Sequence, residues 1–469
     1  MPGVVPQAQG GRQRPGAVGG VTSRPATSGR ASTPAEPSDA PYQVGQDVEV
    51  AIEDVAQGGW CVARPDGLPV MFVRHALPGE RVVARVTEVT SKFARADAVN
   101  ILRSSPDRVD APCPHARPGG CGGCDWQHAS LPAQRALKGT VITQQLRRLA
   151  GIEREVTVEP LPGDGPALAI AEAGGTPGLG WRTRVQFAVD RDGVAGLRAH
   201  RSHQVVDVGD CLIAHQAVRD LDIPGDDWSG ATMVEVAAGG AESAENFAVT
   251  VVEAGGQGPH RNRRNGSGRP SGAKRTLVEG RPYLAEQAVG RLWQVSADGF
   301  WQVHPAAAST LSEAVAAALE PKPGDTVLDL YCGAGLFAGV VAPLVGPEGT
   351  VTGVESDAAA VKNARQNLSD CPWAKFQKAD VAQAASAGDL PPARLVIADP
   401  PRAGLARELV DYLTADHHAE RFAYASCDPA TLARDLALLI SGGWRLENLR
   451  AFDAFPMTHH VECVAALSR

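Results

Sequence analysis

Three short motifs in the last third of the chain carry side chains suited to catalysis. In ADPPRAG, Asp399 ends an apolar strand, and two prolines stiffen the loop that follows it. In YASCDPATL, Cys427 stands between a strand and a helix, whose first-turn amides can favour the nucleophilic thiolate. In HHVEC, Glu462 enters a terminal strand and can serve as a general base. A buried, inert cysteine is the alternative interpretation of Cys427, because single cysteines usually are that.

The stretch 326–335, TVLDLYCGAG, has the pattern of a nucleotide-binding turn. Gly333 and Gly335 allow a tight turn in which a Cβ would keep a ligand from the backbone, whereas Cys332 is expected only to pack there. The next strand ends in Glu355, which is placed to accept both hydroxyls of a ribose. The spacing differs from the G-x-G-x-x-G fingerprint that receives a pyrophosphate. It therefore favours S-adenosylmethionine, which has no phosphate, over NAD; an ordinary strand-to-helix turn is the alternative.

The stretch 113–124, CPHARPGGCGGC, suggests a metal site. Cys121 and Cys124 present two thiols from one glycine turn, Cys113 adds a third, and Cys211 stands in a comparable polar, turn-rich setting. Four thiolates can hold a zinc ion or a 4Fe-4S cluster, and the spacing alone does not separate the two. A group of reactive, unligated thiols is a third interpretation.

Length and composition limit the classes of protein to which the chain can belong. With 469 residues, of which 43% are hydrophobic, we expect two to four domains with real cores. No run approaches 18 apolar residues and the first 40 residues lack the pattern of a signal peptide, so a cytoplasmic protein is expected. The net charge of −8 argues mildly against a nucleic-acid partner, although a net figure can conceal a local basic face.

The first part of the chain reads as a tail followed by a barrel. Residues 1–40 are rich in Gly, Pro, Ser, Ala and Arg, which predicts a disordered tail with solvated arginines. Residues 41–102 hold five short strands, as in a small antiparallel barrel of the OB type. Such a barrel can be purely structural or can bind single-stranded nucleic acid, with Lys92, Phe93 and Arg95 as the residues to test.

Residues 103–290 are expected to form a central α+β domain. An amphipathic helix within 128–152 carries Leu137, Val141, Leu146 and Leu149 at helical spacing; it can pack on the last domain, with its Lys and Arg on the solvated face. Strands between 178 and 215 combine basic side chains with two aromatic ones, which suits phosphate contact and base stacking, although scattered surface charge is the alternative. The residues of this basic region are Arg182, Arg184, Arg198, His200, Arg201 and His203, with Trp181 and Phe187 interleaved. The stretch 254–275 is expected to be a flexible basic loop, which helps to hold RNA or is a tolerated insertion.

Strands and helices alternate through residues 291–469, which predicts a doubly wound, Rossmann-like α/β sheet. The motifs fall at the carboxyl ends of its strands, where such sheets bind ligands.

From Tyr42 onward the sequence resembles the bacterial RNA uracil-5-methyltransferases with an N-terminal TRAM barrel, and closely their iron-sulfur branch, which acts on 23S ribosomal RNA. The resemblance rests on CGGCDWQH, DLYCGAGLF, ADPPRAGL, SCDPATLARDL and FPMTHHVE, in family order. It implies a 4Fe-4S cluster on Cys113, Cys121, Cys124 and Cys211, S-adenosylmethionine bound by Gln302, Tyr331, Leu336, Glu355, Asp380 and Asp399, Cys427 as nucleophile and Glu462 as base. Two features depart from the family pattern: the spacer between Cys113 and Cys121 is longer than usual, and the basic loop near Arg264 is an insertion.

The expected function is methylation of carbon 5 of a uridine in RNA, with 23S ribosomal RNA as the first candidate, through a covalent adduct of Cys427 and uracil. The uridine would be flipped out of its loop to reach the thiol. A tRNA methyltransferase and a non-catalytic RNA-binding iron-sulfur protein are the alternatives. A small-molecule methyltransferase would leave the barrel and the basic segments without a purpose. We expect a monomer with an RNA partner and no membrane contact.

Overall fold

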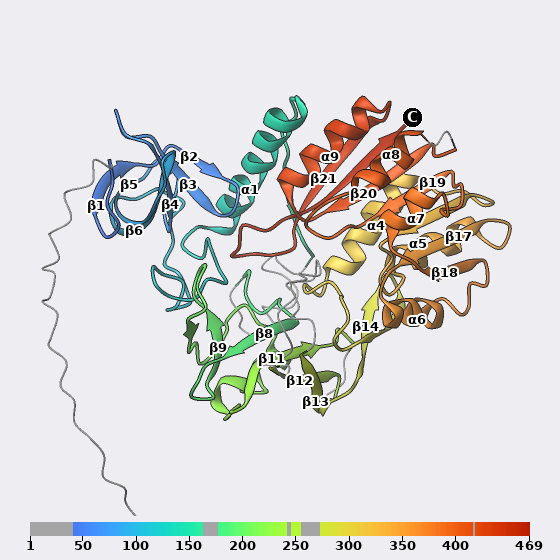
Figure 1. Cartoon of the computed structure of the whole chain (residues 1–469), viewed down its shortest axis with the longest axis horizontal. Helices are drawn as coiled ribbons and strands as arrows, with labels where there is room; N and C mark the ends of the chain where they lie inside the picture. The colour runs from blue at the N-terminus through green and yellow to red at the C-terminus, as the bar shows by residue number, and fades with distance from the viewer. Residues whose placement is uncertain (1–40, 163–176, 242–244, 255–272, 416–417) are drawn as a thin grey trace, which may run out of the picture. The chain divides into compact units, whose positions relative to one another are not determined.

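The computed structural model describes residues 41–162, 177–241, 245–254, 273–415 and 418–469 (Figure 1). The expected tail, 1–40, and most of the expected basic loop, 255–272, lie outside these ranges. Residues 42–469 pack as one compact unit. Within the described residues, no helix is both long enough and apolar enough to cross a membrane.

The N-terminal strands form a closed barrel. Its strands are β1 (Asp47–Ala51), β2 (Asp54–Ala56), β3 (Trp60–Ala63), β4 (Val70–Arg74), β5 (Arg81–Val89) and β6 (Phe93–Arg103), in the order β1-β5-β6-β4-β3-β2. The chain bends at Ile52, so that β1 pairs with β5 whereas β2 pairs with β3, and this bend closes the sheet on itself. The barrel expected from the sequence is present, with six strands rather than five because the bend divides the first strand in two. The expectation that it is antiparallel throughout is wrong, because β4 pairs with β6 in parallel.

Helix α1 (Leu131–Gln145) follows the cysteine-rich turn and continues as a π-helical turn, η1 (Leu146–Ala150). Its apolar face belongs to the core of the last domain, where Ile142 and Leu146 pack in one cluster with Leu432 of helix α9 (Pro429–Ser441). The expectation that its basic residues are solvated is wrong for Lys138. This side chain is fully buried and forms an ion pair with Asp453 at the end of strand β21 (Arg445–Asp453).

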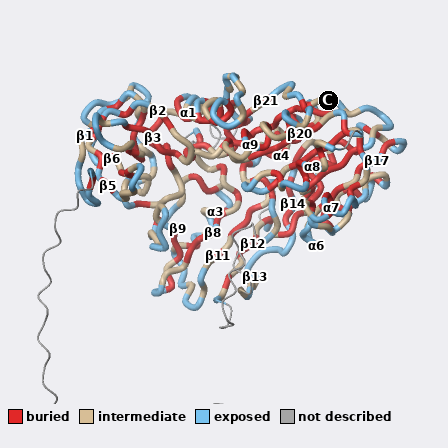
Figure 2. The backbone as a smooth tube through the Cα atoms, turned by 45° about the horizontal axis from the view of Figure 1, so that its top comes forward, coloured by how far each residue is buried: buried red, intermediate tan, exposed pale blue. Residues whose placement is uncertain are grey.

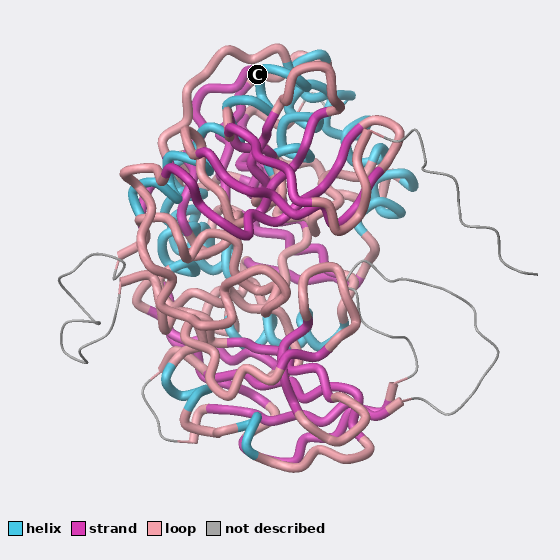
Figure 3. Tube along the Cα trace, turned by 90° about the vertical axis from the view of Figure 1, so that its left-hand side faces the viewer, coloured by secondary structure: helices cyan, strands magenta, loops and turns pink. Residues whose placement is uncertain are grey.

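A second sheet has the order β10-β9-β8-β11-β12-β13. Its strands are β8 (Arg184–Val189), β9 (Ala195–Arg198), β10 (Val205–Val206), β11 (Ala231–Ala238), β12 (Phe247–Glu253) and β13 (Lys274–Gly280). Figure 3 shows this region as strands and loops, with only the short helix α3 (Gln216–Arg219) and the 3₁₀ turn η2 (Ile223–Gly225) described beside them. The predicted stacking of bases on Trp181 and Phe187 is wrong, because both side chains are buried in apolar clusters.

The last domain is built on an eight-stranded sheet in the order β18-β17-β16-β19-β20-β22-β21-β7. Strands β18 (Ala374–Lys378), β17 (Thr350–Glu355), β16 (Thr326–Leu330), β19 (Leu395–Ala398) and β20 (Arg421–Ser426) run parallel, and β22 (Glu462–Ser468) is antiparallel to β20 and β21. The short strand β7 (Val158–Pro160) adds the eighth strand from an earlier part of the chain. Figure 2 shows these strands largely buried, as expected for a sheet covered on both faces.

Helices cover both faces of this sheet (Figure 1). Helices α4 (Ala307–Leu319), α5 (Leu336–Val345) and α6 (Ala358–Asn367) share one apolar cluster, joined by Trp293 of the hairpin β14 (Tyr283–Ala288) and β15 (Arg291–Ser296). Helices α7 (Val381–Ala387), α8 (Arg407–Ala415) and α9 share the other. The doubly wound α/β architecture predicted from the alternation of strands and helices is therefore confirmed.

Replacement of Lys138 by Met should lower the free energy of unfolding by about 3–5 kcal/mol, because it leaves the buried carboxylate of Asp453 without its partner. Guanidinium denaturation would measure the loss as a lower midpoint. The double variant Lys138→Met/Asp453→Leu should regain much of this stability. The exposed pair of Arg407 and Asp411 provides the control, since Arg407→Ala should leave the midpoint unchanged. An unaltered midpoint in Lys138→Met would contradict the buried ion pair.

Candidate active site

The carboxyl ends of three neighbouring parallel strands bring together most of the residues predicted to bind a cofactor. Leu330 at the end of β16 pairs with Val354 of β17 and with Ala398 of β19. Tyr331, Glu355 and Asp399 are thereby placed at one edge of the sheet.

The turn after β16 combines positive backbone dihedrals with a bond to the next strand. Tyr331, Gly333 and Gly335 have φ values of 61°, 52° and 88°. The Gly333 amide donates to Glu355 Oε2 at 3.2 Å. A Cβ on Gly333 would meet open space, which leaves room for a ligand over the backbone. Gly335 has a different reason: a Cβ there would press on Ala364 of helix α6.

The other predicted cofactor residues occupy different positions. Leu336 is buried as the first residue of α5, and Asp380 caps α7 by accepting from the Gln383 amide at 2.9 Å. Gln302 is buried in the segment between β15 and α4. The carbonyl of its neighbour Val303 accepts from the amide and the hydroxyl of Thr183, which ties that segment to the start of the second sheet.

Buried acids make this edge attractive to a cation. Burial raises the pKa of Asp399 to about 6. Burial, and to a lesser degree the charges of Asp399 and Glu355, raises the pKa of Asp329 to about 8, although Asp329 also accepts from the Ala338 amide at 2.9 Å. A positively charged ligand would stabilise the ionised form of each acid and would be held by them in return.

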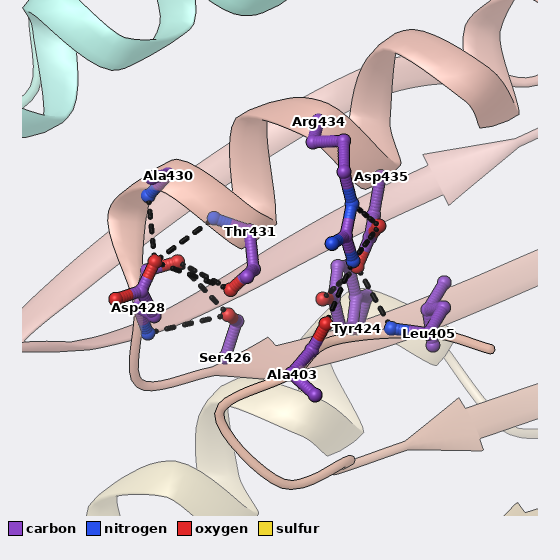
Figure 4. Close-up of polar contacts among 9 residues, drawn as sticks. All are labelled: Ala403, Leu405, Tyr424, Ser426, Asp428, Ala430, Thr431, Arg434 and Asp435. Atoms are coloured by element: carbon purple, nitrogen blue, oxygen red, sulfur yellow. Dashed lines mark hydrogen bonds and ion pairs between the residues drawn. The ribbon is translucent and has the colours of Figure 1, made fainter.

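Cys427 lies between β20 and α9, next to the residue that caps this helix (Figure 4). Asp428 Oδ1 accepts from the amides of Ala430 and Thr431, both at 2.9 Å. The expectation that these amides favour the Cys427 thiolate is therefore wrong, since the neighbouring carboxylate has taken them. Burial and then the charge of Glu462 raise the pKa of Cys427 to about 12.

Glu462 is buried as the first residue of β22. Burial and the nearby Asp399 raise its pKa well above the ordinary value. Burial therefore disfavours the ionised form of both groups, the Cys427 thiol and the Glu462 carboxyl, in the ligand-free site. A base at this position has to lose its proton before it can act.

Arg402 is a functional residue that the sequence motifs did not assign. It lowers the pKa of Cys427 and that of Glu462, so its positive charge favours the ionised form of both groups. Its guanidinium Nη2 lies 3.3 Å from His460 Nε2. Burial, and then the charges of His459 and Arg402, lower the pKa of His460 to about 3, which keeps this ring neutral at physiological pH. The position of Arg402 directly after two prolines at a strand end was the available signal.

A second carboxylate of α9 holds the loop that carries Arg402 (Figure 4). The buried Asp435 Oδ2 accepts from the Tyr424 hydroxyl at 2.7 Å and from the Leu405 amide at 2.8 Å. Arg434 binds Asp435 Oδ1 and also donates to the Ala403 carbonyl at 2.8 Å. The side chains of Asp435 and Arg434 thus hold the loop after β19 at two points, Leu405 and Ala403.

The segment before Glu462 is held by residues near the cysteine-rich turn. The amides of Asp125 and Trp126 both donate to the Met457 carbonyl at 3.0 Å. The Met457 amide donates to Gln134 Oε1 at 2.7 Å, and His459 Nδ1 lies 2.6 Å from Asp125 Oδ2. Asp125 and Gln134 were not predicted, because contacts between such distant positions leave no local pattern.

The four predicted metal ligands, Cys113, Cys121, Cys124 and Cys211, line one cavity together with apolar side chains such as Leu197 and Ile213. Gly122 permits this turn, since a Cβ there would lie 2.7 Å from the backbone of His200. Burial is the main cause of a raised pKa for Cys121, Cys124 and Cys211, and neighbouring thiols of the group raise it further. Across the described residues, no three or more His, Cys, Asp or Glu side chains are arranged to hold a metal ion.

Three family models match parts of the chain. A TRAM domain matches residues 41–99, a methyltransferase domain residues 321–391, and a tRNA (uracil-5-)-methyltransferase residues 392–469. The predicted TRAM barrel and methyltransferase fold are therefore confirmed.

Known relatives span nearly the whole chain. An uncharacterized RNA methyltransferase of Streptomyces coelicolor is 48% identical over 449 residues, with 92% of this chain and 95% of the relative covered. One of Bifidobacterium longum is 35% identical and covers 92% and 98%. The crystal structure of the Pyrococcus abyssi tRNA (uracil-54, C5)-methyltransferase in complex with S-adenosyl-L-homocysteine has a TM-score of 0.65, with 90% of this chain and all of that chain covered. At 24% identity, this likeness establishes a shared fold.

Alkylation of Cys427 by iodoacetamide in the ligand-free protein should accelerate about tenfold per pH unit from about pH 8 to 10, without a plateau, because the reactive thiolate stays a minor species below a pKa of about 12. Mass spectrometry of the peptide that contains Cys427 would measure the rate. A short peptide that contains one exposed cysteine is the control and should level off near its ordinary pKa of about 8.5. Arg402→Leu should slow the reaction, since it removes a charge that lowers this pKa. A plateau below pH 9 in the unaltered protein would contradict the raised pKa.

Proposed function

Because the chain belongs to the RNA uracil-5-methyltransferase family, we propose that it transfers a methyl group from S-adenosylmethionine to carbon 5 of a uridine, with Cys427 as nucleophile and Glu462 as base. The observation that carries this assignment is the placement of side chains from separate segments. Ser426 of β20 pairs with Cys463 of antiparallel β22, so that Cys427, which follows Ser426, lies next to Glu462, which precedes Cys463. Glu462 acts on the pKa of Cys427, and Arg402 acts on both. A nucleophile and an acid–base group side by side are what this reaction requires.

The chemistry explains why both groups are needed. Carbon 5 of uracil is a poor nucleophile, and addition of the Cys427 thiolate to carbon 6 moves the electron pair of the carbon 5–carbon 6 bond into an enolate. S-adenosylmethionine supplies an electrophilic methyl group on a positively charged sulfur. Carbon 5 forms a bond to this methyl group as the bond from methyl to sulfur breaks. Glu462 then removes the proton from carbon 5, and the double bond re-forms as Cys427 leaves carbon 6.

The order of events follows from the charges. The pKa of Cys427 and that of Glu462 are both raised in the ligand-free site, and an added positive charge would lower both. We infer that the cofactor binds before the thiolate forms. Arg402 supplies a fixed positive charge that lowers the pKa of both groups. The protons of the Cys427 thiol and of the Glu462 carboxyl leave to solvent before carbon 5 is deprotonated, so that Glu462 acts as a carboxylate.

We assign the cofactor to the edge formed by Tyr331, Glu355 and Asp399, with contributions from Leu336, Asp380 and Gln302. The open space above Gly333 and the buried acids support this placement. The acids suit the positive sulfur, and the carboxylate of Glu355 suits a ribose.

The first candidate substrate is 23S ribosomal RNA, and tRNA is the alternative. The cysteine motif and the TRAM barrel support the ribosomal substrate through the resemblance to the iron-sulfur branch. The tRNA activity belongs to the Pyrococcus abyssi enzyme by its name, and the shared fold does not extend it to this chain. We expect the enzyme to act as a monomer in the cytoplasm.

We further propose that Cys113, Cys121, Cys124 and Cys211 hold a 4Fe-4S cluster. Each iron of such a cluster takes one thiolate, so its ligands surround a volume instead of converging on one point. Four thiols that line one cavity fit that requirement. Three of these thiols have a raised pKa, so they would remain protonated without a metal.

Incubation with labelled S-adenosylmethionine and unmodified ribosomal RNA should produce 5-methyluridine, measured by nucleoside analysis. Cys427→Ala should abolish the product, because no other group adds to carbon 6. Glu462→Gln should accumulate a covalent protein–RNA adduct, visible as a shifted band on a denaturing gel, since carbon 5 keeps its proton. Cys371→Ala, at a buried cysteine outside the site, is the matched control with full activity. Formation of 5-methyluridine by Cys427→Ala would refute the assignment. If 5-methyluridine forms only in tRNA, then tRNA replaces 23S ribosomal RNA as the proposed substrate.

Protein purified without oxygen should absorb light at about 400 nm and contain about four iron ions per chain. Cys124→Ser should lose both signals, whereas Cys371→Ala should keep them because it lies outside the cavity. Stoichiometric zinc without iron would overturn the cluster.

A further inference from the structure

The tip of the β2–β3 hairpin is the part of the barrel that reaches the catalytic loop. Gln57 Nε2 donates to Asp428 Oδ2 at 3.1 Å. Asp428 directly follows Cys427, and its other oxygen caps helix α9. One carboxylate beside the nucleophile is therefore held from two sides, by its own helix and by the barrel.

The hairpin is docked through apolar and polar contacts. Val55 of β2 and Leu77 pack in one buried cluster with Trp126 and Val141, which belong to the cysteine-rich turn and to helix α1. Gln144 of the same helix donates to Asp54 Oδ2 at 2.9 Å. Val141 and Gln144 are three residues apart and so lie on one face of α1, and these contacts keep the tip in place. The barrel is therefore not a freely tethered module.

Gly59, at the tip of the hairpin, allows the hairpin to approach Asp125 closely. Gly59 has a φ of 79°, and a Cβ on it would lie 2.8 Å from Asp125 Cγ. Asp125 in turn contacts His459, three residues before Glu462. The hairpin tip thus lies against the segment of the nucleophile through Gln57 and against the segment of the base through Gly59.

We propose that Gln57 is a positioning residue for methyl transfer, which holds Asp428 and thereby the Cys427 loop through its side-chain hydrogen bond. The inference rests on the proposed function for its kinetic consequence but not for the contact itself. Because Gln57 is neutral, it satisfies Asp428 Oδ2 and draws this oxygen toward the barrel without adding a charge near the thiol. Its role is separate from any contact of the barrel with RNA.

The test uses the full-length protein with Gln57→Leu and Gln57→Glu, and with Gln43→Leu as the control, since Gln43 is an exposed glutamine of the same barrel region. Loss of one hydrogen bond should reduce kcat about three- to tenfold, with the KM for RNA within about twofold of the unaltered protein. The alkylation rate of Cys427 should fall with kcat. Gln57→Glu should be slower still, because it adds a negative charge beside Asp428. Gln43→Leu should change none of these values.

A double-mutant cycle checks that the effect passes through Asp428. Asp428→Ser keeps a helix-capping oxygen but lacks the second oxygen that Gln57 binds. Gln57→Leu should therefore have no further effect in the Asp428→Ser background. An equal effect in both backgrounds, or a higher KM for RNA with unchanged kcat and alkylation, would overturn the proposal. The alkylation rate requires neither RNA nor cofactor, so failure of the proposed function and failure of this inference are distinguishable.

Discussion

Buried carboxyl groups lie near the Cys427 thiol at the carboxyl edge of the large sheet. The rest of the site depends on this arrangement. Asp399 raises the pKa of Asp329 and that of Glu462, and Glu462 raises that of Cys427. Charge of one sign cannot accumulate in such a place without compensation. Arg402 provides part of it, and a cofactor with a positively charged sulfur would provide the rest. The electrostatics of the ligand-free site thus account for the choice of cofactor.

The catalytic edge is held in place by parts of the chain that take no part in the chemistry. The segment between β21 and β22 contacts Asp125, Gln134 and Lys138, which precede it by more than 300 residues. Asp125 directly follows Cys124, so the turn that presents the thiols also supports the segment that leads to Glu462. Barrel, cysteine-rich turn and methyltransferase sheet therefore share one framework in which each part limits the position of the next.

The sequence patterns were misleading where they predicted an exposed side chain that the structure buries. Trp181 and Phe187 lie among arginines in the sequence but are buried in apolar clusters. Phe187 belongs to β8, in which alternate residues face opposite sides, whereas Trp181 precedes this strand. Lys138 lies on helix α1, whose Lys and Arg were expected on the solvated face, and is nevertheless buried, because Asp453 from a distant strand pairs with it. In both cases contacts with other parts of the chain, and not the neighbouring residues in the sequence, decided whether the side chain is buried or exposed.

The sequence by itself determined the order of strands and helices, the glycine turn after β16 and the ends of strands at which the chemistry lies. These features depend on backbone preferences and on the alternation of side chains, which are local properties. Only the tertiary structure decided that four cysteines line one cavity, that Asp428 takes the amides expected to favour the Cys427 thiolate, and that Arg402 lowers the pKa of both Cys427 and Glu462. Burial and charge at one point are set by segments far apart in the chain, and no local pattern records which of them will meet.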